Sequence, residues 1–213
     1  MLQSLGMPKT RMEIFSDGVI AILITIMVLE LKPPQGSNLS ALLGAVPALL
    51  TYAVSFLFLG TYWNSHHHML HLTERVNGAV LWANLHLLFW LSLIPFVTSW
   101  LASSDFASLP TAVYGVVMAL AAIAFTILEV VVIRVQGTNT ALARAVGSDR
   151  KGKISITLLA AGIPLAFVNR YVSDVLYVIV ALIWLVPDTR IERFVSSSAP
   201  TEEAEIPSLS PEA

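Results

Sequence analysis

The sequence predicts an all-α integral membrane protein, and three observations carry that prediction. Of the 213 residues, 56% are apolar and only 12% are charged, whereas soluble domains carry about 25% charged residues. The apolar residues gather in six segments, most of them long enough for a membrane-crossing helix of roughly 17 to 25 residues. The chain contains no cysteine, so disulfides, thiolate metal sites and thiol nucleophiles are excluded.

The six apolar segments are the expected transmembrane helices. They cover residues 12–31, 39–73, 76–104, 106–128, 154–169 and 171–187. Pro95 is expected to kink the third helix, because proline removes a backbone donor. The last two segments are short and could form a less regular hairpin. We therefore expect one six-helix domain over residues 1–195 and a disordered tail over 196–213, which is rich in Ser, Pro, Ala and Glu.

The basic residues predict the orientation of the chain. Of its 12 lysines and arginines, all but Lys32 and Arg170 fall on one side if the N-terminus is cytoplasmic. Cytoplasmic loops carry an excess of Lys and Arg, so both termini are expected inside the cell. The formal net charge of −2 and the lack of a basic stripe argue against a nucleic-acid partner.

The first apolar segment carries acidic residues inside both of its ends. At 100° per residue, Ser16 and Asp17 fall on roughly the opposite side from Ile22. An unpaired Asp17 in hydrocarbon would cost at least about 2.5 kcal/mol, so we expect its face to pack against protein. The opposite stripe is left for lipid, another helix or a pore, and periodicity alone favours plain helix packing. That stripe comprises Phe15, Gly18, Val19, Ile22, Thr25, Ile26 and Leu29.

Polar residues in the next two segments are candidate interaction partners for Asp17. Trp63 and His66 lie three residues apart, so they share a helix face, and they end the second segment on the same membrane side as Asp17. An Asp–His–Trp cluster is therefore geometrically allowed. Asn84 and His86 lie at membrane depth in the third segment and should face protein.

The histidine run at residues 66–71 also allows a metal interpretation, because His67 and His71 at i, i+4 can share a divalent ion. No acid completes a HExxH pattern, and Glu74 is the only nearby carboxylate. Contact with headgroups and water is the favoured interpretation. The sequence shows no nucleophile with a base, no glycine-rich phosphate loop and no paired catalytic carboxylates, so no enzyme is expected.

These residues resemble a known family. The pattern at residues 11–17 is similar to the RxxxFSD signature of the transmembrane protein 175 family, the endolysosomal potassium channels and their bacterial and archaeal relatives. Prokaryotic members carry one six-helix unit per chain, as this sequence does, so the resemblance implies a multi-pass protein in the cell membrane of a prokaryote. The matching positions are Arg11, Phe15, Ser16, Asp17, Trp63, His66, Asn84 and Pro95.

The resemblance implies a homotetrameric, potassium-selective channel in the lipid bilayer, lined by the first helix of each subunit. The narrow section is a bulky aliphatic residue five positions after the signature aspartate, here Ile22, with Ile26 and Leu29 also facing the pore. Thr25 corresponds to a layer implicated in potassium preference. No cofactor or bound metal is implied beside the permeant potassium ion. The implied packing network around the pore helix comprises Arg11, Phe15, Ser16, Asp17, Trp63, His66 and Asn84.

The physics of such a channel is consistent with the sequence. There is no TVGYG-like stretch, so a backbone-carbonyl filter is excluded. A ring of Ile22 side chains could block ions by dewetting, and Glu30 near the outer mouth could concentrate cations.

Two other classes of function stay open. A secondary transporter or proton-conducting membrane protein also places acids and histidines at membrane depth, although inverted repeats and interrupted helices are not evident. A structural or assembly protein would use its first helix only to oligomerise.

Overall fold

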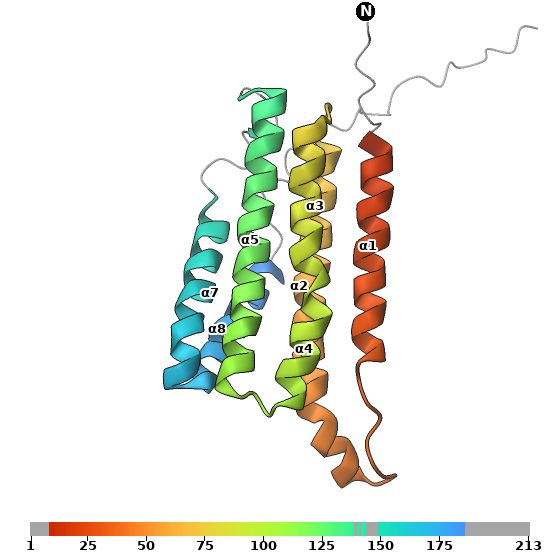
Figure 1. Cartoon of the computed structure of the whole chain (residues 1–213), viewed down its shortest axis with the longest axis vertical. Helices are drawn as coiled ribbons and strands as arrows, with labels where there is room; N and C mark the ends of the chain where they lie inside the picture. The colour runs from red at the N-terminus through yellow and green to blue at the C-terminus, as the bar shows by residue number, and fades with distance from the viewer. Residues whose placement is uncertain (1–8, 139, 141, 144–148, 186–213) are drawn as a thin grey trace, which may run out of the picture.

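The computed structural model describes residues 9–138, 140, 142–143 and 149–185, and the elements that it describes are all helices (Figure 1). The helices run side by side as a bundle. In chain order they are α1 (Lys9–Leu29), α2 (Leu39–His71), α3 (Gly78–Ser92), α4 (Ile94–Ser103), α5 (Ser108–Gln136), α7 (Arg150–Val168) and α8 (Arg170–Leu185).

Five helical stretches among the described residues are long and apolar enough to cross a membrane: α1, α2, α3 together with α4, α5, and α7. The all-helical membrane prediction is confirmed to that extent. The sixth predicted segment corresponds to α8, whose 16 residues fall short of the roughly 17 that a straight span needs. Residues 186 and 187 of that segment, and the tail predicted for 196–213, lie outside the described residues.

Helix α5, which corresponds to the fourth predicted segment, extends further than that segment. The prediction ended at residue 128, with Glu129 and Arg134 at the exit, but α5 continues to Gln136 and includes both residues. Hydropathy marks the part of a helix that suits lipid, and a helix can extend beyond that part into polar surroundings.

Near Pro95, where a kink was predicted, the helix is interrupted at Leu93, between α3 and α4. The helix stops where the N–H of Leu93 bonds to the carbonyl of Trp90 at 3.2 Å. Pro95 then stands in the first turn of α4, where its missing N–H has no helical partner to lose.

Side-chain caps fix the starts of three helices. Asn38, Asn77 and Asp149 each accept a backbone N–H three residues later, at 2.9, 3.1 and 2.8 Å respectively. Such caps satisfy a donor that the first turn of a helix leaves without a partner. They place the beginnings of α2, α3 and α7.

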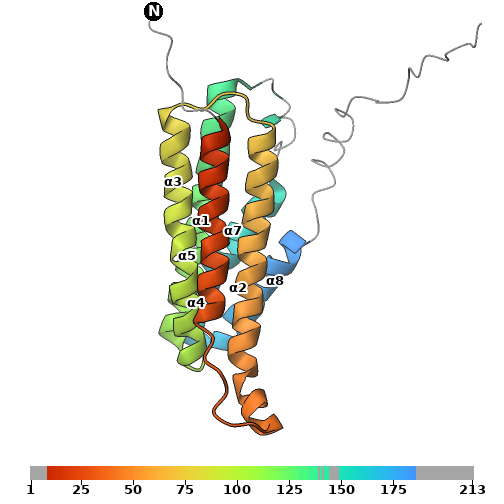
Figure 2. The same cartoon turned by 90° about the vertical axis from the view of Figure 1, so that its right-hand side faces the viewer.

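The first helix stands at one edge of the bundle. It packs against α2, α3 and α4, while α5 packs against α3, α4, α7 and α8. Figure 2 shows α1 in front of the bundle, between α2 and α3. The helix therefore has one face inside the protein and one face that no other described element covers.

Candidate functional site

The inner face of α1 is formed by residues three or four positions apart. This spacing puts them on one side of a helix. Their side chains are buried against α2, α3 and α4. The residues are Met12, Ser16, Ile20, Leu23 and Met27.

The outer face of α1 includes most of the apolar stripe that the sequence predicted, although Val19 of that stripe packs partly against the core. Ile22 is 58% exposed, Ile26 39% and Leu29 81%, and Thr25 between them is also exposed. The described helices of this chain leave these side chains exposed, so the helix packing that periodicity favours would have to involve another chain. In a membrane protein, such a surface is covered by lipid, by a second chain or by the contents of a pore.

Ser16 begins a chain of hydrogen bonds that crosses from α1 to α3 and α2. Its hydroxyl donates to the carbonyl of Met12 at 2.8 Å and lies 2.9 Å from Nδ2 of Asn84. Oδ1 of Asn84 lies 2.7 Å from Nε2 of His66. All three side chains, of Ser16, Asn84 and His66, are at most 2% exposed.

The direction of each bond follows from the chemistry of the groups. The one proton of the Ser16 hydroxyl goes to Met12, so Ser16 must accept from the amide nitrogen of Asn84. The amide oxygen of Asn84 then faces His66, and an oxygen of this kind only accepts. His66 therefore carries its proton on Nε2. The three side chains hold α1 at one rotation relative to α2 and α3.

The carboxylate of Asp17 accepts a hydrogen bond from Trp63, whereas His66 bonds to Asn84. The indole Nε1–H of Trp63 donates to Oδ1 of Asp17 at 3.0 Å. Within the Asp–His–Trp cluster that the sequence allowed, the hydrogen bonds pair Asp17 with Trp63 and His66 with Asn84. Arg11 and Phe15 are exposed, and within the described part of the chain neither has a hydrogen bond, ion pair or ring contact.

The hydroxyl of Thr25 bonds within its own helix. It donates to the carbonyl of Ile22 at 2.8 Å. Because the proton is used there, the lone pairs of the Thr25 oxygen stay available to accept from water or to contact a cation.

Glu30 lies just beyond the end of α1, beside α4. Its Oε2 accepts a hydrogen bond from the hydroxyl of Ser99 at 3.1 Å. The two residues line a shallow, open groove between α1 and the α3–α4 pair. Sequence reasoning missed Ser99, because 69 positions separate it from Glu30 and a lone serine carries no pattern.

The rings of the histidine run stack on one another and on Trp63. The rings of His67 and His71 stack at 6.5 Å, and His67 also stacks on Trp63 at 5.9 Å. No group of three or more His, Cys, Asp or Glu side chains in the described ranges could hold a metal ion.

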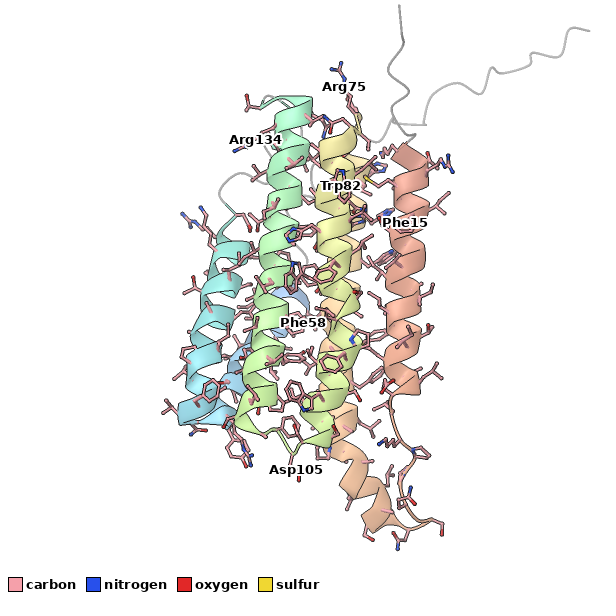
Figure 3. All side chains as sticks on the ribbon, in the orientation of Figure 1. Phe15, Phe58, Arg75, Trp82, Asp105 and Arg134 are labelled. Carbon is pink, nitrogen blue, oxygen red and sulfur yellow. The ribbon has the colours of Figure 1, made fainter. Side chains whose placement is uncertain are left out.

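The two ends of the bundle differ in charge. Figure 3 shows Arg75 and Arg134 at the end near the N-terminus and Asp105 at the opposite end. Two helices, α1 and α7, also begin with basic residues.

Comparison with known proteins relates the chain to potassium channels. The family model described as the endosomal/lysosomal potassium channel TMEM175 matches residues 11–95, a stretch that contains the Ser16–Asn84–His66 chain and the exposed stripe of α1. A potassium channel of Chryseobacterium sp. (strain P1-3) is 52% identical over 187 residues, which cover 88% of this chain and 97% of the relative. A potassium channel of Streptomyces collinus is 40% identical over 123 residues, covering 54% of this chain and 60% of the relative.

A solved structure has the same fold. The crystal structure of a lysosomal potassium-selective channel TMEM175 homolog from Chamaesiphon minutus superposes with a TM-score of 0.73 at 28% sequence identity. The match covers 83% of this chain and 96% of that one.

Proposed function

This chain belongs to the TMEM175 family of potassium channels, and from that premise we propose that it forms a potassium-selective channel of four identical subunits with α1 lining the pore. The observation that carries the proposal is the outer face of α1. It is apolar, the described residues of the chain leave it uncovered, and it lies opposite the face that Ser16 anchors.

The proposed gate is the ring of Ile22 side chains. Four bulky aliphatic side chains around a narrow axis exclude water, and ions do not cross a dry constriction. Ile26 and Leu29 extend the constriction along α1. A small rotation or tilt of α1 would widen the ring and admit water, so the hydrogen bonds that fix the rotation of α1 belong to the gating apparatus.

Thr25 and Glu30 are the proposed polar positions of the ion path. The hydroxyl oxygen of Thr25, whose proton is bonded to Ile22, offers lone pairs that replace part of the hydration shell of a potassium ion. The carboxylate of Glu30, held by Ser99, raises the local cation concentration at the mouth of the pore.

The proposed setting is the cell membrane of a prokaryote, with both termini in the cytoplasm. The named relatives above are bacterial potassium channels. Among the described residues, the basic side chains gather at the end where the N-terminus lies, which the positive-inside rule assigns to the cytoplasm. The other end carries Lys32 and Arg170.

Purified protein in liposomes under a potassium gradient tests the proposal. We expect unitary currents that favour potassium, and a severalfold larger current for Ile22→Ala and Ile22→Asn, because both changes reduce the hydrophobic barrier. Val28→Ala is the matched control. Val28 is 48% exposed on the same helix but lies about 120° around it from Ile22, so its current should equal that of the wild type.

Each other outcome identifies another class of protein. A saturable flux coupled to protons, without unitary currents, would indicate a transporter. A well-folded oligomer that passes no ions in any variant would indicate an assembly protein. Equal effects of the Ile22 and Val28 substitutions would remove Ile22 from the gate.

A further inference from the structure

The start of α1 is held in the bundle by several hydrogen bonds. Ser16 bonds to α3 at 2.9 Å, and Asp17 bonds to α2 at 3.0 Å. Nζ of Lys9 donates to the carbonyl of His71 at 3.3 Å, where α2 ends. Ser16 is fully buried, so water does not compete for its bond. The start of α1 is therefore fixed relative to α2 and α3.

The other end of α1 is joined to α4 through Glu30. The hydroxyl of Ser99 donates to Oε2 of Glu30 at 3.1 Å. The contact lies at the end of the bundle away from the N-terminus (Figure 1). Among the described residues, no other hydrogen bond joins positions 22–30 to a neighbouring helix, because Thr25 bonds within α1.

Side-chain packing between α1 and α4 is incomplete around this bond. The open groove separates the two helices there, with Leu23 and Ile26 of α1 along one wall. Phe96 and Trp100 form part of the opposite wall, and their rings pack on each other at 6.0 Å. Where a groove lies between two helices, the van der Waals contacts that would resist their movement are missing. The bond between Glu30 and Ser99 therefore carries a larger share of what holds this end of α1.

The chemistry of the groove singles out Ser99. Ser92 and Ser103 also line the groove, but their hydroxyls donate to carbonyls of their own helices at 2.7 and 3.2 Å. Ser99 instead donates to a carboxylate on another helix. A hydrogen bond to a charged acceptor is stronger than one to a neutral acceptor. Ser99 is thus the serine of this groove that connects α4 to α1.

We propose that Ser99 is a positioning residue of the channel. Through Glu30 it holds the outer end of α1 in the arrangement in which the ring of Ile22 is narrow. The inner end of α1 is the pivot, and the outer end, with Ile26 and Leu29, moves when the bond breaks. A sideways movement of four symmetry-related helices increases the distance of each from the axis, so the ring widens. This inference rests on the proposed channel function.

Single-channel recording on the full chain in liposomes tests the role of Ser99. The ratio of open to closed time reports the position of α1, and the unitary current reports the ion path. Ser99→Ala should raise the ratio at least about twofold, which is the lower end of the effect of one hydrogen bond. At high potassium concentration, where the charge of Glu30 is screened, its unitary current should equal that of the wild type. Ser99→Thr keeps the hydroxyl and should restore the wild-type ratio.

Three further variants make the test specific. Ser103→Ala is the matched control, because Ser103 is exposed in the same groove and donates within α4. Its ratio should equal that of the wild type. Glu30→Ala removes the acceptor and should raise the ratio as Ser99→Ala does. In the double variant, Ser99→Ala should add nothing to Glu30→Ala, because the bond is already absent.

The possible failures can be told apart. A wild type without unitary currents would overturn the channel proposal, and the role of Ser99 with it. If the wild type conducts, any of three results overturns the role of Ser99 alone. They are a ratio that Ser99→Ala does not raise, an equal rise for Ser103→Ala, or a further rise when Ser99→Ala is added to Glu30→Ala.

Discussion

At the scale of the residue, the most constrained group is the amide of Asn84. Among the described residues, it is the one side chain that bonds to both α1 and α2, through Ser16 and His66. Because Ser16 uses its proton on its own helix, only one orientation of the amide satisfies every group. Because only one amide orientation satisfies these hydrogen bonds, they specify how α1, α2 and α3 are oriented relative to one another. Apolar packing, by contrast, tolerates small rotations of a helix.

Replacing Asn84 by leucine should destabilise the protein. The substitution leaves the Nε2–H of buried His66 without an acceptor, which costs about 1–3 kcal/mol. The midpoint of thermal unfolding in detergent measures the effect. Ser92→Ala is the control on the same helix. Ser92 is exposed and bonds only to the carbonyl of Phe89, so its loss should change stability by less than about 0.5 kcal/mol. Equal midpoints for the two variants would contradict the structural role of Asn84.

At the scale of the element, Tyr177 determines how closely α8 approaches α5 and α7. Its ring lies against two glycines, one on each partner helix. A Cβ built on Gly115 would come within 2.6 Å of Cζ of Tyr177, and one on Gly162 within 2.5 Å of Cε1. These contacts leave no room for even a methyl group.

Gly115→Ala should therefore weaken the packing of α8. Overpacking of this kind costs about 1–3 kcal/mol and should lower the unfolding midpoint in detergent. Gly44→Ala is the matched control, because nothing lies within 4 Å of its Cβ position. In a helix, that change should be neutral or slightly stabilising. An unchanged midpoint for Gly115→Ala would show that α8 can move away from α5 without loss.

The sequence predicted the elements better than the contacts between them. The exposed stripe of α1 follows from helical periodicity, and the break near Pro95 follows from the missing donor of proline, so each could be inferred locally. The end of α5 could not, because hydropathy does not report where a helix stops. Neither could the bond between Glu30 and Ser99, since nothing local links two residues so far apart in the chain.

At the scale of the whole molecule, α1 stands at the edge of the bundle with an uncovered apolar face. The basic residues gather at one end of the same bundle. The first feature supports assembly around α1, and the second gives the assembly its direction in the membrane.

Single cysteines test that direction, because the chain has none of its own. Ser37 lies between α1 and α2, and Glu74 lies between α2 and α3; both are exposed. We expect a membrane-impermeant maleimide to label Ser37→Cys in intact cells and Glu74→Cys only after permeabilisation. The reverse pattern would place the termini outside.

The most direct test of the pore is chemical modification of Ile22→Cys during potassium current recording. A cationic trimethylammonium methanethiosulfonate attaches a positive charge at that position. If α1 lines the pore, modification should block the current, while Val28→Cys, on another side of the helix, should keep its current after the same treatment. A modified Ile22→Cys protein that conducts potassium unchanged would contradict the account.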